Sequence, residues 1–223
     1  MCFSPQADIA GGVVAGAIGI DALRHVQLKS ERLLAALPLL LGAHEVVEAF
    51  VWWGLTDKVS WSVGGTAVWL YVAFAFVALP VLVPMAVMAV EPDPRRRKIM
   101  IAFTAVGVAV AVIYLVAIVT RSVGARIDGH TVVYSIHLGQ DGAANGLYVL
   151  ATCGLLLISS HRHIVIFGFV NAAAVAVLLL LASNANISLW CAWAAVTSLV
   201  IAGHLRLSHR AHERSSSLPG QLA

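Results

Sequence analysis

Residues 99–120 read IMIAFTAVGVAVAVIYLVAIVT and follow directly on the basic run Arg95–Lys98. The stretch contains no charged side chain. A helix needs about 20 apolar residues to cross a hydrocarbon core about 30 Å thick. Because lipid offers the backbone no hydrogen bonds, a chain that crosses it has to pair its own N–H and C=O groups, as an α-helix does. The stretch therefore predicts a transmembrane helix.

Six further apolar stretches flank this one, at about residues 8–24, 33–55, 66–90, 146–160, 164–182 and 186–205. Of the 223 residues, 60% are hydrophobic and only 11% are charged, far from the balance of an ordinary soluble domain. We therefore predict an all-α integral membrane protein, a bundle of about seven transmembrane helices. Residues 1–214 are expected to form one domain and residues 215–223 a disordered cytoplasmic tail. Pro80 and Pro84 are expected to kink the third helix, the only one that looks broken.

The basic residues divide unequally between the two sides of a seven-helix bundle. Lys58, Arg121 and Arg126 are the three of the 14 Lys and Arg residues on one side, which leaves 11 on the other. The positive-inside rule places the 11 in the cytoplasm, with the N-terminus outside and the C-terminus inside. The net charge of +3 fits contact with membrane lipids. No basic patch interleaved with aromatic residues suggests nucleic acid.

The Trp and Tyr residues are also distributed unequally. With this topology all ten fall in the outer half of the helices or in the outer loops. They either anchor the helix ends as an interfacial belt or line a pocket that opens outward. The ten are Trp52, Trp53, Trp61, Trp69, Tyr71, Tyr114, Tyr134, Tyr148, Trp190 and Trp193.

The strongest chemical signal lies in the second predicted helix, where residues 44–52 read HEVVEAFVW. His44, Glu48 and Trp52 are spaced i, i+4 and i+8, near one face, and Glu45 reaches Glu48 through i, i+3. A charged group near the centre of a transmembrane helix costs about 2.5–3.5 kcal/mol. These side chains are therefore expected to point into the bundle, where the two carboxyls hold or share a proton.

Two cysteines are further candidate ligands for an ion at His44 and Glu48. Cys191 belongs to the seventh predicted helix, and Cys2 lies just outside the first. A transition metal held by His44, Glu48, Cys191 and Cys2 is one interpretation. A proton-sharing hydrogen-bond network between His44 and a carboxyl is a second, and a disulfide between the two cysteines is a third.

The loop between residues 121 and 146 is predicted to contain a β-hairpin. Asp128-Gly129 between extended residues is typical of a tight hairpin turn. His130 and Tyr134 would share one face of it, and His137 would lie on the other. Such a hairpin could cover the site as a lid. The residues expected to contact a small ligand there are Trp52, His130, Tyr134 and Trp190.

Several familiar classes of membrane protein do not fit. The three lysines all lie in loops, so no helix offers one for a retinal Schiff base. Only His44 is well placed for burial, whereas a bis-histidine haem needs two imidazoles. The run HEVVE at 44–48 departs from the zinc-protease pattern H-E-x-x-H in its last residue. The sequence assigns no enzyme class.

Five short motifs together resemble a group of uncharacterised bacterial membrane proteins that begin Met-Cys-Phe-Ser and are frequent in actinobacteria. The resemblance implies a multi-pass protein of the bacterial plasma membrane and no established activity. It draws attention to Cys2, Glu48, Trp52 and Cys191. Gln is usual in that group where Glu45 stands, which argues against a shared role for Glu45. The motifs are MCFS at 1–4, HEVVEAFVW at 44–52, Gly129-His130 with Tyr134, SSHR at 159–162 and ISLWC at 187–191.

Three classes of function remain open from the sequence. The first is binding of a transition metal or small ligand around Glu48, with or without redox chemistry. The second is a proton-coupled transporter in which Glu48 titrates. The third is a non-catalytic accessory subunit whose polar cluster holds helices together. Paired broken helices are common in transporters, and a single predicted break does not favour the second class.

Overall fold

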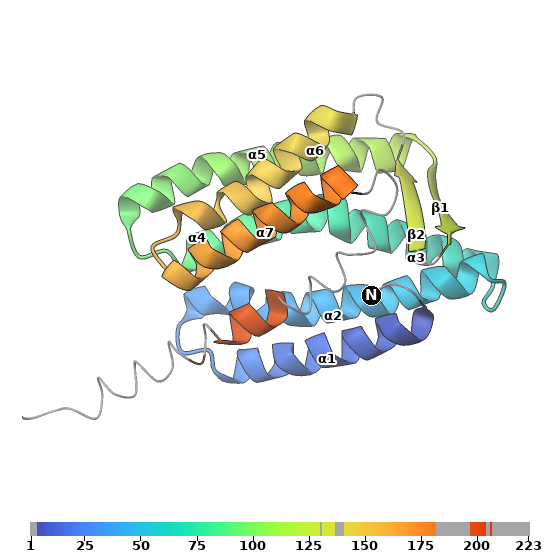
Figure 1. The fold of residues 1–223 in the computed structure, drawn as a ribbon, viewed down its shortest axis with the longest axis horizontal. Coiled ribbons are helices and arrows are strands. Elements are labelled where there is room, and N and C mark those ends of the chain that lie inside the picture. Colours follow the sequence, from blue (N-terminus) through green and yellow to red (C-terminus); the bar gives the residue numbers. More distant parts are fainter. Residues whose placement is uncertain (1–3, 130, 137–140, 182–196, 204–205, 207–223) are drawn as a thin grey trace, which may run out of the picture.

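The computed structural model describes residues 4–129, 131–136, 141–181, 197–203 and 206. This part of the chain is mostly helical (Figure 1), as predicted. Its main helices are α1 (Pro5–Arg24), α2 (Arg32–Leu55), α3 (Trp61–Ala73), α4 (Leu79–Val90), α5 (Pro94–Thr120), α6 (Asp141–Val149) and α7 (Arg162–Leu181). Residues 197–203 add a further helical segment. The two strands are β1 (Val123–Asp128) and β2 (Thr131–Ile136).

Four helical spans in the described ranges are long and apolar enough to cross a membrane. They are Pro5–Arg24, Lys29–Leu55, Trp61–Val90 and Pro94–Thr120. Two shorter apolar helices follow, Gly142–Ile158 and Arg162–Ala174. The chain therefore has the helices of a membrane protein. The seventh predicted helix at 186–205 and the tail at 215–223 fall mainly or wholly outside the described residues, and the single-domain boundary stays a prediction.

The predicted distortion near Pro80 takes the form of a π-helical turn, η2 (Phe74–Ala78), which joins α3 to α4. Proline lacks a backbone N–H, and its ring crowds the carbonyl four residues earlier, so the wider turn relieves the clash. The expectation that only this helix is broken was wrong. A second π-turn, η3 (Leu150–Gly154), follows α6, and no proline in the sequence nearby predicts it.

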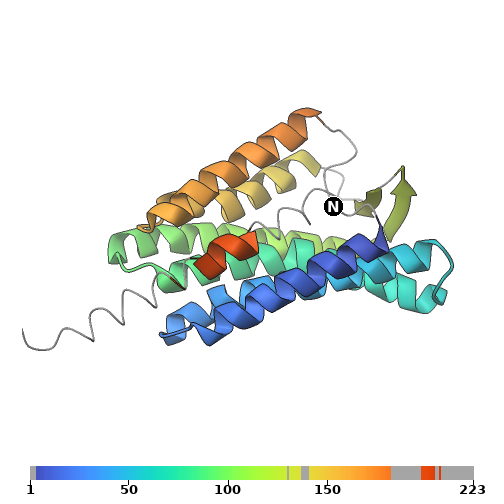
Figure 2. The same ribbon diagram turned by 60° about the horizontal axis from the view of Figure 1, so that its bottom comes forward.

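Helices α1 and α2 pack unusually closely, and Figure 2 shows α1 lying along α2. A Cβ added to Gly12 would lie 2.7 Å from the carbonyl oxygen of Gly42, and one added to Gly19 would lie 2.4 Å from the backbone nitrogen of Leu39. Glycine permits this approach because it has no side chain between the two backbones. The contact fixes how far α1 stands from the polar residues of α2.

We expect Gly12→Ala to destabilise the protein by about 1–3 kcal/mol, because its methyl group would meet backbone of α2 that cannot easily move. Gly65→Ala in α3 is the matched control, since a Cβ there meets nothing within 4 Å. Alanine at Gly65 should be neutral or stabilising by up to about 1 kcal/mol through helix propensity. Thermal unfolding in detergent measures both. Equal stability of the two variants would show that the backbones of α1 and α2 lie far enough apart at Gly12 to accommodate a methyl group.

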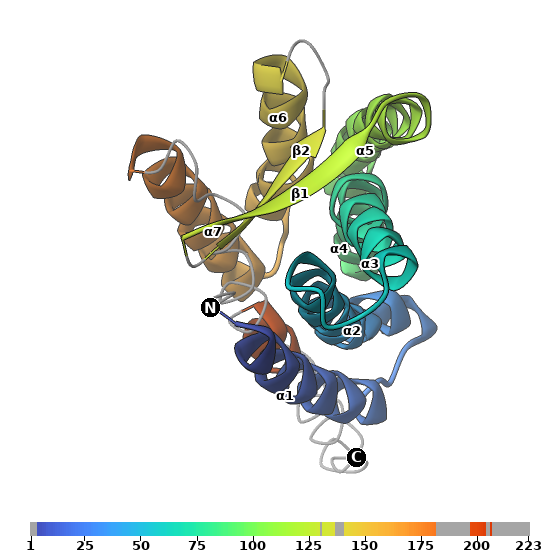
Figure 3. The ribbon, with the colours of Figure 1, turned by 90° about the vertical axis from the view of Figure 1, so that its right-hand side faces the viewer.

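The predicted hairpin is confirmed. Strands β1 and β2 pair antiparallel from Val123↔Ile136 to Asp128↔Thr131, and Gly129 has the positive φ of 62° that the turn requires. The hairpin crosses one end of the bundle (Figure 3). Its inner face is buried through Val132 and Tyr134, whereas Arg126 lies exposed. We call this end of the molecule the hairpin end.

At the opposite end, which we call the basic end, a buried carboxylate ties two loops together. Glu91, between α4 and α5, accepts hydrogen bonds from the backbone and hydroxyl of Ser160, from the hydroxyl of Ser159 and from the backbone of Asp93. Arg96 donates to the carbonyl oxygens of Ile158 and Ser159. Burial raises the pKa of Glu91, but the hydrogen bonds outweigh burial and hold the pKa below its usual value.

A carboxyl whose pKa is lowered by folding stabilises the fold above its unfolded pKa and loses that contribution as pH falls through its folded pKa. Glu91→Gln keeps the shape but weakens charge-assisted hydrogen bonds, so we expect a loss of about 1–3 kcal/mol at neutral pH. The loss should shrink on acidification below about pH 4. Unfolding of both proteins across this range measures it. A constant difference between the two at every pH would contradict the role of the charge.

Candidate functional site

Three buried carboxyl groups meet near the hairpin end. One oxygen each from Asp8 of α1 and from Glu45 and Glu48 of α2 lies within 4.8 Å of the others. The three side chains are 1%, 4% and 0% exposed. Glu45 and Glu48 share a face of α2 through their i, i+3 spacing, and the close approach of Gly12 to Gly42 brings Asp8 to that face. We call these three residues the carboxyl triad.

The side chain of Asp8 has no hydrogen-bond partner in the part of the chain that the structure describes. Within the described residues, both of its oxygens and the ring nitrogen of Trp52 are buried side-chain atoms without one. Asp8 and Trp52 interact electrostatically, but their geometry falls short of a hydrogen bond. Burying a polar group with no partner costs free energy that a hydrogen bond would otherwise offset. The two oxygens of Asp8 are therefore the atoms of the triad best suited to bind a ligand.

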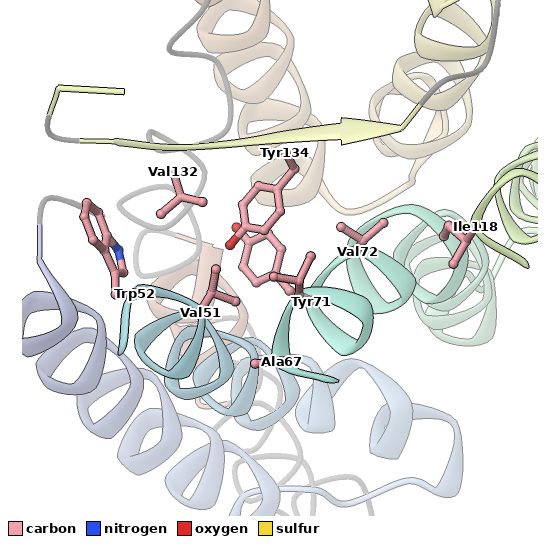
Figure 4. Packing of buried hydrophobic residues seen from close by; sticks show 9 residues of the cluster. Val51, Trp52, Ala67, Tyr71, Val72, Ile118, Val132 and Tyr134 are labelled. Carbon is pink, nitrogen blue, oxygen red and sulfur yellow. The ribbon is translucent and has the colours of Figure 1, made fainter. Parts of the chain in front are cut away.

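Two tyrosines lie against Glu48. The hydroxyl of Tyr134, from β2, donates to Oε1 of Glu48 at 3.3 Å, and the hydroxyl of Tyr71, from α3, also interacts with this carboxyl. The two tyrosine rings (Figure 4) stack with centroids 4.3 Å apart. Burial raises the pKa of Tyr134 well above its usual value, so its hydroxyl keeps the proton that it donates. The hairpin thus contributes a hydrogen bond directly to the triad.

Apolar side chains pack around the two tyrosines. Beneath the hairpin the packed residues come from α2, α3, α5 and β2, so that the strand closes the end of the helical bundle (Figure 4). Such packing leaves a polar group little water and lowers the local dielectric, which strengthens every electrostatic interaction within. The cluster consists of Val51, Trp52, Ala67, Val68, Tyr71, Val72, Ile118, Val132 and Tyr134.

The structure brings together some of the residues that the sequence singled out. Glu48, Trp52 and Tyr134 lie together beneath the hairpin. His44 is not one of the three residues of the triad, but its ring stacks on Tyr71 at 4.0 Å and tilts against Phe74 at 4.7 Å. The predicted site residues Cys2, His130, Trp190 and Cys191 lie outside the described residues.

The predicted metal ligands did not include two members of the triad. Glu45 was predicted to reach Glu48 and to hold or share a proton with it, although the resemblance argued against a shared role, and its carboxyl approaches both others. Asp8 was not among the predicted site residues. The signal that could have found it is the cost of a carboxyl in an apolar helix, since Asp8 stands in the first turn of α1.

A profile of DUF6629, a family of unknown function, matches residues 1–216. The chain belongs to this family. No curated protein and no solved structure matches it. The match covers the triad, the hairpin and all described helices, so DUF6629 membership extends to every part of the site. The family brings no activity with it, and the chemistry of the triad has to be argued from its own atoms.

The triad concentrates negative charge when its carboxyls are ionised. Two carboxylates with oxygens 4.8 Å apart repel by about 3 kcal/mol at an effective dielectric constant of about 20, and three such pairs exist here. A buried site of this kind becomes favourable when protons or a cation neutralise it. The arrangement can therefore hold a proton or bind a positively charged ion. It offers no nucleophile paired with a base among the described residues of the triad.

Proposed function

We propose that this DUF6629 protein is a multi-pass protein of the plasma membrane that binds a metal cation in the carboxyl triad beneath the hairpin. The observation that supports the proposal is the convergence of three carboxyl oxygens within 4.8 Å, together with both oxygens of Asp8, which have no hydrogen-bond partner among the described residues. Oxygens at such separations can share one ion, because metal–oxygen distances for the larger divalent cations are about 2.3–2.6 Å. The triad needs no sulfur ligand for this, and the assignment of Cys2 and Cys191 as ligands stays a sequence-based prediction outside the described residues.

We further propose that the chain crosses the membrane seven times with the hairpin end outside. The unequal division of basic residues supports it. Arg95–Lys98 and Arg162 lie at the basic end, whereas the two strands of the hairpin carry one basic residue, Arg126. The cation site would then lie in the outer half of the membrane and exchange ions with the exterior.

A reporter active only in the cytoplasm is expected to work when fused after Ala223. In a chain whose cysteines are replaced, Arg126→Cys should react with a membrane-impermeant thiol reagent in intact cells. Arg95→Cys, equally exposed at the basic end, is the matched control and should react only after the membrane is opened. A C-terminal fusion active outside the cytoplasm, or the reverse pattern of labelling, would contradict the topology.

Metal-dependent thermal stability tests cation binding itself. Protein stripped with a chelator should melt at a higher temperature when divalent cations are restored, because a ligand at 100 times its Kd stabilises the folded state by about 2.7 kcal/mol. The double variant Asp8→Asn/Glu48→Gln should show no such rise.

Glu31→Gln is the matched control for this experiment. Glu31 is another buried carboxyl, next to the other end of α2, and one of its oxygens accepts from the backbone N–H groups of Gln27 and Leu28. Glutamine keeps an acceptor oxygen there, so the control should respond to metal as the unaltered protein does. The proposal fails if no cation stabilises the unaltered protein more than the double variant.

A further inference from the structure

We infer that the bound ion is a hard divalent cation that sheds most of its water, of the class of Ca²⁺ or Mn²⁺, and that the three carboxyls rather than sulfur or imidazole hold it. This inference rests on the proposed function and narrows it to one class of ion. It departs from the sequence-based prediction of a transition metal held by His44 and two cysteines.

The donor atoms of the site are the first argument. In the described ranges, the triad is the one group of His, Cys, Asp and Glu side chains whose ligand atoms lie close enough to share an ion. All three offer oxygen, and the nearby hydroxyls of Tyr71 and Tyr134 are oxygen as well. Carboxylate, carbonyl and water oxygens suit Ca²⁺, Mg²⁺ and Mn²⁺, whereas thiolates favour Zn²⁺ and Cu⁺.

Two softer donors among the described residues, His44 and Cys153, make other contacts. The imidazole of His44 lies between helices α2 and α3 in ring contact with Tyr71 and Phe74. Cys153 is buried in η3 and accepts a hydrogen bond from the amide of Asn171 at 3.0 Å. Neither belongs to the group that can share an ion with Glu48.

Charge favours a divalent over a monovalent ion. Three ionised carboxyls and one divalent ion leave a single negative charge, whereas a monovalent ion leaves two within 4.8 Å. The ring nitrogen of Trp52 interacts with Asp8 and has no hydrogen-bond acceptor of its own among the described residues. It can donate to the Asp8 oxygen that does not bind the ion. Hydrogen bonds of this kind commonly fix the orientation of the side chains that bind a metal.

Burial distinguishes among the hard divalent ions. The three carboxyls are at most 4% exposed, and Tyr134, which contacts Glu48, packs with Trp52 and valines in one buried cluster. Mg²⁺ gives up its water reluctantly and usually keeps several water ligands. Ca²⁺ takes six to eight oxygens in flexible geometry, and the three carboxyls can supply up to five of them while one Asp8 oxygen faces Trp52. An enclosed site of carboxyls therefore suits the larger, more readily dehydrated ion.

The experiment is a set of metal titrations on stripped, full-length protein, with melting temperature and the electron paramagnetic resonance signal of free Mn²⁺ as readouts. Ca²⁺ and Mn²⁺ should each bind and should displace one another, and Mg²⁺ should bind at least tenfold more weakly. Na⁺ should not compete at equal concentration. Replacing all three cysteines by serine, or His44→Phe, which keeps a ring to stack on Tyr71, should change the Ca²⁺ affinity less than threefold.

The failures of the two proposals differ. If Zn²⁺ binds, Ca²⁺ does not, and the cysteine-free chain or His44→Phe loses Zn²⁺ more than tenfold, cation binding holds but the hard-ion assignment is overturned. Saturation of the site by Na⁺ or Mg²⁺ in preference to Ca²⁺ overturns it as well. If no ion binds more tightly to the unaltered protein than to Asp8→Asn/Glu48→Gln, the proposed function itself fails.

Discussion

Glu48→Gln is expected to weaken divalent cation binding by about 100-fold or more while the protein still folds. The amide keeps the shape of the side chain and an oxygen that can accept the hydrogen bond from Tyr134, so the ring stack beneath the hairpin should persist. The charge of the most deeply buried of the three carboxyls is lost, and 100-fold corresponds to about 2.7 kcal/mol. Titration of stripped protein with Ca²⁺ measures the affinity.

Glu31→Gln makes the same chemical change at the far end of the same helical segment and should bind Ca²⁺ like the unaltered protein. Folding of each variant is checked by its melting temperature in chelator. If Glu48→Gln folds and binds with unchanged affinity, Glu48 is not a ligand, and its carboxyl serves only to hold helices and hairpin together through Tyr134.

Asp8→Asn should have opposite effects on stability in the presence and absence of metal. Without metal we expect it to be at least as stable as the unaltered protein, by up to about 2 kcal/mol, because it removes a carboxyl that has either to hold a proton or to repel Glu45 and Glu48. It has no hydrogen bond to lose among the described residues. The favourable position of an acidic residue in the first turn of α1 offsets only about 0.3–1 kcal/mol of this gain.

With saturating Ca²⁺ the order should reverse, since only the unaltered protein gains the stabilisation of a bound ion. Unfolding curves in chelator and in Ca²⁺ test both halves of this prediction. A clear loss of stability in chelator, of more than about 1 kcal/mol, would show that Asp8 is a structural hydrogen-bonding group and not a ligand held ready for an ion.

The helices and the hairpin could be predicted because their signals are local. Residues 99–120 form most of α5. The helix begins five residues earlier, at Pro94, because its first turn is basic and hydrophobicity alone does not mark it as part of the helix. Asp128-Gly129 specified the hairpin turn through the one residue that readily takes positive φ. The π-turn at η3 has no such local mark.

The composition of the site depends on packing between helices, which local patterns do not encode. Both His44 and Glu45 lie within reach of Glu48 along α2, and spacing alone does not decide which of them turns towards α1. The structure decides it, because Gly12 draws α1 against the face that carries Glu45. A Gln in place of Glu45, as the resemblance describes, would still offer an oxygen ligand.

The metal content of the purified protein tests the central claim most directly. The unaltered chain, Glu31→Gln, Glu48→Gln and Asp8→Asn are purified side by side, dialysed against one buffer containing Ca²⁺ and Mn²⁺, and analysed for all elements. We predict about one divalent ion per chain in the first two, with Ca²⁺ or Mn²⁺ as its identity, and close to none in the last two. Equal metal content in all four proteins, or none above the buffer in the unaltered chain, would contradict a cation site at the carboxyl triad.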